Sequence, residues 1–519
     1  MQKLLIVLFT LVLSMQTVQA ASVDEFIDNN LAPIMNTIAD IIFMDMPFTE
    51  VPIIIFWILF AGFFFTFFFR GLSVWGFKHA IDTVISHDKN HADSHDDGGN
   101  TGEVSSLQAL ATALSGTIGI GSIAGVAISI SIGGPGAAFW IFAGALLGMS
   151  IKFVEASAAV KYRRFNLDGS VSGGPMHYIS HGLTRKKLRP LGQFLSVLFA
   201  TLCIGGAITG GNMIQINQSA HQLVHITGGE ASFLHGCTWI FGLVVAIIVG
   251  AAVVGGIKSI AKVTSVLVPT MCLLYIGAGL VVILANFVNI PHALWIIVKE
   301  AFAPEAVAGG VFGTIIIGLR RSVQSNEAGT GAAAIAYATV KTKEPISQGF
   351  VSILETFLTG VLCLLTSLVI VLCTDLSQIT ASVSGIELAS SAFGSVIGLF
   401  PYLLSMIAIL FALSTLISWA YYGQKAWNFL FGEGKKRNLT FNIIYCVFIV
   451  VGSAMNVTSI INITDAMMIA MSIPNIIALY ILAPEIKQDL FDYCKRFNVG
   501  TLIYRDRLAK LATVEETEV

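Results

Sequence analysis

The feature that most constrains this chain is a succession of long apolar segments separated by short polar ones. About eleven segments follow residue 20, and each is near or above the roughly 20 residues that an α-helix needs to cross a bilayer. They lie at 51–70, 105–131, 137–160, 192–221, 236–256, 262–285, 306–338, 347–373, 397–423, 439–456 and 462–484. Mean hydropathy is +0.81, and only 12% of the residues are charged. This pattern predicts an all-α polytopic membrane protein without a separate soluble domain.

Residues 1–20 have the pattern of a secretory signal peptide. Lys3 supplies the positive start, residues 4–15 the apolar centre, and Val18-Gln19-Ala20 the small-residue end. An uncleaved first helix is the alternative. The predicted order is then an extracytoplasmic segment, a first transmembrane helix, two halves of a membrane core and a cytoplasmic tail, over residues 21–50, 51–70, 105–285, 306–484 and 485–519.

Lysine and arginine residues are concentrated in alternate loops between the apolar segments. One set of loops and the tail hold Lys78, Lys89, Lys161, Arg163, Arg164, Arg185, Lys186, Lys187, Arg189, Lys258, Lys262, Lys341, Lys343, Lys425, Lys435, Lys436, Arg437, Lys487, Lys495, Arg496, Arg505, Arg507 and Lys510. The opposite loops hold almost no basic residue, with Lys299 as the exception. Because basic loops stay in the cytoplasm, this predicts a multi-pass protein of the cell membrane, with its N-terminus outside and its C-terminus inside. The net charge of −2 argues against a nucleic acid as partner.

The second apolar segment contains a stretch that resists a continuous helix, Ser115-Gly116-Thr117-Ile118-Gly119-Ile120-Gly121-Ser122-Ile123-Ala124-Gly125. Each glycine in a helix interior costs about 1 kcal/mol relative to alanine. Within a bilayer, freed backbone groups occur only where protein or a watery cavity satisfies them. The stretch has two interpretations, a broken helix that holds an ion or a small polar ligand, or close helix packing on small residues.

A second interruption lies in segment 306–338, where the run Gly318-Leu319-Arg320-Arg321-Ser322-Val323-Gln324-Ser325-Asn326-Glu327-Ala328-Gly329-Thr330-Gly331 precedes a new helix start. Charged side chains at membrane depth cost several kcal/mol unless they are paired or hydrated. A loop after an early helix end is the alternative. With segment 51–70 set aside, the two breaks fall in the first and sixth remaining spans, which indicates a five-plus-five inverted repeat.

The chain resembles the alanine/glycine:cation symporter family, also called sodium:alanine symporters, over almost its whole mature length. The resemblance rests on Gly116-Thr117-Ile118-Gly119, Gly133-Gly134-Pro135-Gly136 with Phe139-Trp140, Gly148-Met149, Lys161-Tyr162-Arg163, Gly173-Gly174-Pro175-Met176, Gly211-Asn212-Met213-Ile214-Gln215, Ser325-Asn326-Glu327-Ala328-Gly329, and Ser414-Thr415 with Trp419, Tyr421, Tyr422 and Gly423. It implies a LeuT-like fold and uptake of a small neutral amino acid, alanine or glycine, driven by a sodium ion without an organic cofactor.

Sodium ligands are expected on two spans. The resemblance implies the hydroxyls of Ser414 and Thr415, together with carbonyls around Gly116 and Thr117, since sodium prefers hard oxygens. Hydroxyls bonded back along their own helix are the alternative for Ser414 and Thr415.

Substrate contacts are expected at both breaks. The N–H groups of the half-helix that begins near Ser122, next to Gly119 and Gly121, suit a carboxylate. Asn212 and Gln215 lie three residues apart on one expected helix face, where a helix–helix hydrogen bond is the alternative. Gln324, Ser325 and Asn326 are expected at the amino end of the substrate, and Trp419 at the wall of its side-chain pocket.

Three positions depart from the family pattern. Gly121-Ser122 stands where members usually have Gly-Asn, Ile120 replaces what is often threonine or leucine, and the stretch after Phe350 has Glu355 but lacks the usual aspartate. These departures leave proton coupling as an alternative to sodium. A channel is less expected because the polar positions are isolated, and a membrane enzyme is not expected because no His-Glu-x-x-His or Gly-x-Ser-x-Gly motif occurs. The transported amino acid, the ion stoichiometry and the oligomeric state stay open.

Overall fold

The computed structural model of the chain describes residues 33–45, 52–93, 102–166, 169–253, 255–302, 310–374 and 385–500. The predicted signal peptide, residues 1–20, lies outside these ranges, as does the last part of the tail. Within them the protein is mostly helical, and the strands β1 (Arg164–Phe165) and β2 (Val171–Ser172) pair antiparallel. The prediction of an all-α protein is confirmed.

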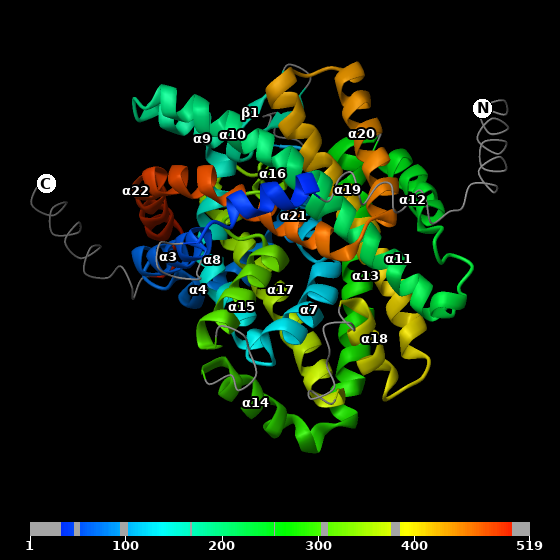
Figure 1. Ribbon diagram of the computed structural model, residues 1–519. Helices are drawn as coiled ribbons and strands as arrows, with labels where there is room; N and C mark the ends of the chain where they lie inside the picture. Colours follow the sequence, from blue (N-terminus) through cyan, green and yellow to red (C-terminus); the bar gives the residue numbers. More distant parts are fainter. Residues whose placement is uncertain are drawn as a thin grey trace, which may run out of the picture.

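The helices follow one another with short connections (Figure 1). After a helix over Pro33–Ile42, the first half has α3 (Ile53–Phe68), α4 (Leu72–Trp75), α5 (Phe77–Asp93), α6 (Ser106–Thr117), η2 (Ile120–Ser122), α7 (Ala124–Gly133), α8 (Ala137–Lys161), α9 (Pro175–Arg185), α10 (Arg189–Ile208), η3 (Thr209–Met213), α11 (Ile214–Ile226), η4 (Gly229–Ala231), α12 (Thr238–Val253), α13 (Gly256–Ala285), η5 (Phe287–Asn289) and α14 (Ile290–Phe302). The second half has α15 (Gly310–Asn326), α16 (Ala334–Tyr337), α17 (Pro345–Cys373), α18 (Ile386–Gly394), α19 (Phe400–Phe431), α20 (Lys435–Ala454), α21 (Val457–Ala470) and α22 (Ser472–Phe497).

Among the described residues, seven helical stretches are long and apolar enough to cross a membrane, and the bent pair of α6 with η2 and α7 makes an eighth. At the predicted segments 51–70, 236–256 and 306–338 the structure has α3, α12 and α15, which are shorter, with 16, 16 and 17 residues. Each predicted segment therefore holds a helix. The number of helices that span the bilayer stays a prediction.

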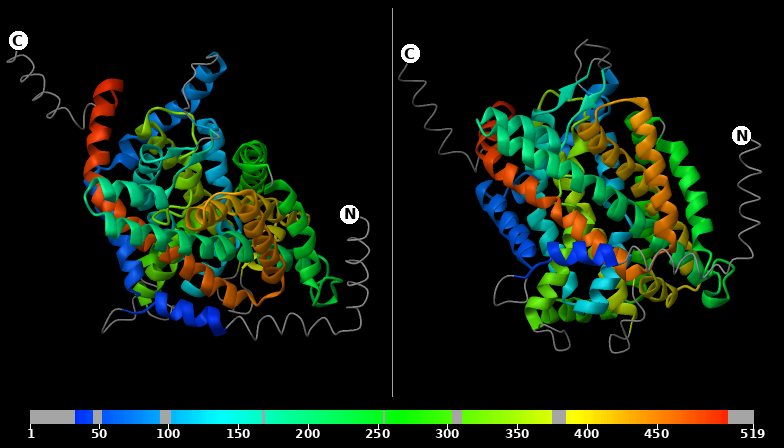
Figure 2. Two further views of the ribbon diagram at one scale, coloured as in Figure 1. Left: turned by 90° about the horizontal axis from the view of Figure 1, so that it is seen from above. Right: turned by 45° about the horizontal axis from the view of Figure 1, so that its top comes forward.

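Loops that the charge pattern assigns to one side of the membrane meet at one end of the molecule. Arg163 donates from Nη1 to the carbonyl of Ala338 (3.0 Å) and from Nη2 to that of Thr342 (2.6 Å). Lys425 Nζ donates to the carbonyl of Val171 (2.9 Å). Helix α9 lies at this end, whereas α14 lies at the opposite end (Figure 1; Figure 2 gives two further views). The contacts join three loops of the basic set.

Helix boundaries follow local sequence signals. Helix α6 begins with a capping box, in which Ser105 Oγ accepts from the Gln108 backbone N–H (3.2 Å) and Gln108 Oε1 accepts from that of Ser105 (3.0 Å). Helices α9 and α17 begin with Pro175 and Pro345 in the first turn, where the missing N–H is not needed.

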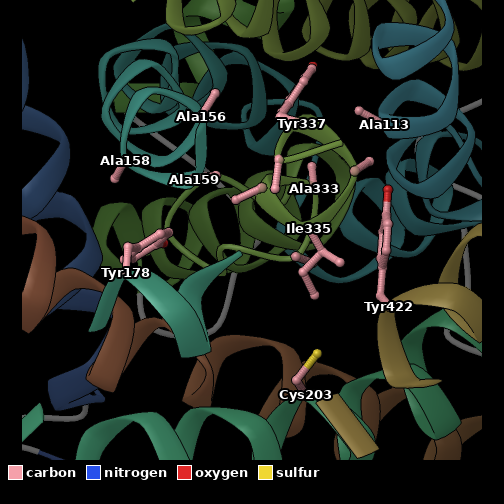
Figure 3. Close-up of a cluster of buried hydrophobic side chains, with 14 of the residues drawn as sticks. Ala113, Ala156, Ala158, Ala159, Tyr178, Cys203, Ala333, Ile335, Tyr337 and Tyr422 are labelled. Atoms are coloured by element: carbon pink, nitrogen blue, oxygen red, sulfur yellow. The ribbon is translucent and has the colours of Figure 1, made fainter. Parts of the chain in front are cut away.

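Small side chains let the spans approach closely around the centre of the molecule. Helix α17 lies against α8, and a Cβ added at Gly349 would lie 2.2 Å from Ser157 Oγ. The short helix α16 is buried on all sides, and Figure 3 shows its Ile335 between Ala159 of α8 and Tyr422 of α19. This packing holds the region after the second break in the interior.

Candidate functional site

The first break is a bend of 62° between α6 and α7, at the glycine-rich stretch. Side chains from two other spans satisfy backbone groups that the break frees, as a membrane interior requires. Gln215 Oε1 on α11 accepts from the Ile120 N–H at 2.9 Å. Thr366 Oγ1 on α17 donates to the Ser122 carbonyl at 2.9 Å. The sequence stretch is a discontinuous helix, as predicted.

The glycines of this break have different surroundings. A Cβ at Gly119 would lie 2.7 Å from Gln215 Oε1 and 2.8 Å from Thr415 Oγ1. The spans that carry Gln215 and Thr415 can therefore lie this close to the break only because residue 119 is a glycine. A Cβ at Gly121 would meet no atom within 4 Å. Open space therefore lies beside Gly121, next to the start of α7, where the sequence predicts the substrate carboxylate.

The hydroxyls predicted to bind sodium lie beside the same break. Thr415 Oγ1 donates to the Ser115 carbonyl (3.0 Å), and Ser115 Oγ donates to the Ser414 carbonyl (2.7 Å), so α6 and α19 are joined at this level. Ser414 Oγ itself donates to the Phe411 carbonyl of its own helix (2.9 Å). Thr117 Oγ1 likewise donates back to the Ala113 carbonyl at 3.2 Å. Ser414 therefore shows the alternative given for it, a hydroxyl bonded back along its own helix, whereas Thr415 bonds across to α6, and the sodium site stays a prediction.

Asn212 and Gln215, predicted on one helix face, bond to different elements. Asn212 Nδ2 donates to the Tyr445 carbonyl of α20 at 2.8 Å, whereas Gln215 reaches the first break. Asn212 lies within η3, a π-helical turn over Thr209–Met213, and its bond to α20 is the helix–helix hydrogen bond given as the alternative. Gly211 in this turn packs on the Trp419 ring, since a Cβ there would lie 2.1 Å from Trp419 Cγ.

The second break follows Asn326, the last residue of α15. Asn326 Oδ1 accepts from the Ala328 N–H (2.8 Å) and its Nδ2 donates to Ser322 Oγ (2.9 Å), so the side chain holds the turn. Ser325 Oγ donates to the Ser322 carbonyl (3.0 Å), and Gln324 Oε1 accepts from Arg321. The three polar residues predicted to hold the amino end are therefore hydrogen-bonded within their own segment.

Glu327 connects the two breaks through Trp419. Its backbone has a φ of +55°, a conformation that costs a non-glycine residue about 1–2 kcal/mol and that often occurs at functional sites. Trp419 Nε1 on α19 lies 3.1 Å from Glu327 Oε1 and 3.3 Å from the Gly116 carbonyl. The indole N–H therefore faces both interrupted helices, in addition to any role of the ring as a pocket wall.

Comparison with known proteins shows the family of this chain. Residues 6–504 match the family model described as "Sodium:alanine symporter family". The chain belongs to this family. The symporter is 38% identical over 396 residues to the sodium/alanine symporter AgcS of Methanococcus maripaludis, covering 75% of this chain and 84% of AgcS. It is 32% identical over 409 residues to the probable sodium/glutamine symporter GlnT of Bacillus subtilis, covering 78% and 82%.

Among solved structures, a crystal structure of MhsT in complex with L-phenylalanine has a TM-score of 0.49 with this symporter and 15% identity, over 74% of this chain and 99% of that chain. Membership of the family means that the protein is a cation-coupled amino-acid symporter and a multi-pass membrane protein, and not an enzyme.

The symporter also contains a buried ionic cluster that the sequence analysis missed. Lys152 Nζ lies 2.8 Å from Glu355 Oε1, with side-chain exposures of 1% and 0%. Tyr337 donates to Glu355 Oε2 at 2.7 Å. Both carboxylate oxygens of Glu355, the residue considered for proton coupling, therefore have a partner. The signal in the sequence was the position of Lys152 and Glu155 inside an apolar segment, because a charged residue at membrane depth is a candidate functional residue.

Glu155 extends this cluster of the symporter to the second break. Asn475 Nδ2 on α22 donates to Glu155 Oε1 (2.7 Å) and to the Gly329 carbonyl (2.8 Å). Over the described residues, Glu155 Oε2 and Glu327 Oε2 have no hydrogen-bond partner. Two buried carboxylates thus have an unused acceptor oxygen each, close to the backbone of the break.

Proposed function

We propose that this symporter carries a small neutral amino acid, alanine or glycine, into the cell with sodium by alternating access. The observation that carries this proposal is the open space beside Gly121 at a break whose backbone is held by Gln215. An amino-acid carboxylate fits the N–H groups at the start of α7, where the helix dipole favours a negative group.

The other predicted residues have roles consistent with this site. The oxygens of Ser115, Ser414 and Thr415, with the carbonyls near Gly116 and Thr117, offer hard donors to a sodium ion next to the carboxylate. The Trp419 ring, fixed by its N–H, limits the space for the substrate side chain. A substrate side chain bounded by this ring would have to be small, as in alanine or glycine, although one methylene discriminates by only about 1–3 kcal/mol.

Proton coupling is the second candidate. Glu155 and Glu327 favour it, because each has one buried carboxylate oxygen without a hydrogen-bond donor among the described residues, and such an oxygen can take up a transported proton. Glu355 is a weaker choice for this role, since Lys152 and Tyr337 occupy its oxygens.

Uptake by purified protein in proteoliposomes tests the proposal. Labelled alanine and glycine are offered under an imposed sodium gradient and, separately, under an imposed proton gradient. Accumulation driven by sodium alone supports the proposal, and accumulation driven by protons alone supports the second candidate. Flux that does not saturate and does not exchange with unlabelled amino acid would indicate a channel.

A further inference from the structure

An apolar groove lies between α12 and α20, two helices that lie side by side at the edge of the molecule (Figure 1). Its volume is about 350 Å³, within the roughly 300–1,000 Å³ that is usual for a ligand site. The small residues Ala246 and Gly250 of α12 form its floor together with Cys446 of α20. The Cys446 sulfur lies 3.5 Å from the Ala246 carbonyl oxygen, and a Cβ added at Gly250 would lie 3.4 Å from that sulfur. We call this feature the α12–α20 groove. Neither helix carries a residue of the two breaks, so the groove is separate from the proposed substrate site.

One face of α20 connects the α12–α20 groove to basic residues. Leu439, Ile443 and Val447 line the groove and are exposed. Lys435 lies one helical turn before Leu439, and Lys436 lies two turns before Ile443, so both lysines are on the helix face that lines the groove. Both are exposed, and neither has an acidic partner among the described residues. The groove therefore ends at two ammonium groups that are open to the surroundings.

The charge at this end of the groove is positive in excess. Lys258, in the first turn of α13 just after α12, is exposed, and so is Arg437. The acidic residue next to them in sequence, Glu433, is already used, since its Oε1 accepts from Asn166 Nδ2 (3.1 Å) and from Ser172 Oγ (3.0 Å). An anion placed at the end of the groove would therefore meet several cations.

We propose that the α12–α20 groove binds an anionic phospholipid, with an acyl chain on its apolar floor and the phosphate at Lys435 and Lys436. Basic residues at a membrane surface attract anionic headgroups, and phosphate oxygens accept charge-assisted hydrogen bonds from lysine. The charge pattern assigns these lysines to the cytoplasmic side, so the lipid comes from the cytoplasmic leaflet. The inference does not depend on which amino acid or ion is transported.

A second copy of the chain is the other occupant to consider, and it fits the groove less well. A two-fold axis along the membrane normal would bring the same surface of both copies together. Lys435 and Lys436 of one copy would then face the same cations of the other, which repel one another. The excess of positive charge thus favours a lipid of opposite charge.

Helix α20 also connects the groove to the interior of the symporter. Tyr445, next to Cys446, donates to the carbonyls of Gly211 (3.1 Å) and Leu416 (3.0 Å). Asn212 in turn donates to the Tyr445 carbonyl (2.8 Å). A lipid bound only by the folded protein stabilises it, so the anionic lipid should raise the melting temperature.

Native mass spectrometry of the purified protein tests the charged end of the groove. Phosphatidylglycerol and phosphatidylcholine with the same acyl chains are titrated in separate samples, and the bound lipids are counted. The double variant Lys435→Gln/Lys436→Gln removes the two charges. Its matched control is Lys341→Gln/Lys343→Gln, which removes two exposed lysines from another loop of the basic set.

The apolar floor is tested in the same way. Gly250→Leu fills the groove with a side chain. Gly277→Leu is the control, because Gly277 is exposed on α13 and a Cβ there would meet no atom within 4 Å. Melting temperatures with each lipid are measured on the same samples.

We expect the parent chain to bind phosphatidylglycerol about tenfold or more tightly than phosphatidylcholine. Lys435→Gln/Lys436→Gln should lose about fivefold in affinity for phosphatidylglycerol per lysine, and its affinity for phosphatidylcholine should stay unchanged. Gly250→Leu should weaken the binding of both lipids, and both controls should behave as the parent does. Phosphatidylglycerol should raise the melting temperature of the parent more than that of either groove variant.

Cys446 supplies a second measurement on the unmodified protein, because it lies on the groove floor and is half-buried. Phosphatidylglycerol should slow maleimide labelling of Cys446, read from the mass of its peptide, whereas labelling of the half-buried Cys272 on α13 should not change. Equal affinity of the parent for the two lipids, unchanged binding in the lysine variant, or unchanged labelling of Cys446 would each overturn the proposal. A dimer that Gly250→Leu dissociates would assign the groove to a second copy and overturn it as well.

Discussion

Trp419 donates its indole N–H toward Glu327 Oε1 across 3.1 Å, with both residues at most 2% exposed. The two residues belong to different spans, α19 and the second break, and the same N–H faces the first break at the Gly116 carbonyl. A single donor therefore holds together the two segments that surround the proposed substrate. This relationship gives the first prediction.

Trp419→Phe should weaken amino-acid binding by about tenfold or more. The variant keeps an aromatic ring but leaves a buried carboxylate oxygen without its donor, which costs about 1–3 kcal/mol. Binding by equilibrium dialysis and uptake in proteoliposomes measure the effect. Trp427→Phe is the matched control on the same helix, because the Trp427 N–H has no partner among the residues described. Equal behaviour of the two variants would contradict the role given to the Trp419 N–H.

Gly119→Ala and Gly121→Ala should fail in different ways. The new methyl group at Gly119 displaces Gln215 and Thr415, so the melting temperature of the purified protein should fall together with transport. The methyl group at Gly121 enters open space, so the melting temperature should stay near that of the parent while substrate affinity falls. If Gly121→Ala binds alanine normally, the space beside Gly121 is not where the substrate lies.

Gly119→Leu and Gly121→Leu extend this comparison. Both variants should insert into the membrane, since insertion depends on total hydrophobicity, and neither should move an amino acid. Surface expression and uptake are measured together. Normal transport by either variant would mean that its glycine serves helix packing alone.

Ser414→Ala and Thr415→Ala should each raise the sodium concentration needed for half-maximal uptake. Each removes an oxygen from the cluster beside the first break, and Thr415→Ala also removes the bond to the Ser115 carbonyl. Thr415→Ser restores a hydroxyl and is the control. Unchanged sodium dependence in both alanine variants would place the ion elsewhere.

Lys152→Met should destabilise the protein strongly, by about 3–5 kcal/mol, because it leaves the buried Glu355 carboxylate without its cation. Lys152→Met combined with Glu355→Gln should be markedly more stable than Lys152→Met alone, since the carboxylate that lost its cation is then replaced by a neutral amide that still accepts from Tyr337. Thermal unfolding in detergent measures both. A double variant less stable than the single one would show that the ion pair is not the reason for the loss.

A cysteine placed at Ser180 on α9 should resist an impermeant reagent added to intact cells, whereas one at Glu230 between α11 and α12 should react. Glu230 is exposed in the loop that the charge pattern assigns to the outside. Labelling of Ser180→Cys from outside would show that the predicted topology is the wrong way round.

The sequence by itself determined the class of the protein, its family and the positions at which helices break. These follow from local properties. Glycines between Gly116 and Gly121 weaken the helix wherever the segment lies, and Arg320, Arg321 and Glu327 are charges inside an apolar run in any fold. The same local information placed the polar residues of the site at both breaks.

Only the tertiary structure decided which group each of these side chains contacts. Gln215 bonds to the Ile120 N–H and Asn212 bonds to α20, because spans distant in sequence pack on both sides of this helix. Lys152 meets Glu355 across 203 positions of the chain. Periodicity describes one helix at a time, whereas a buried polar group finds its partner on a neighbouring helix, and the packing of all the spans together selects that neighbour.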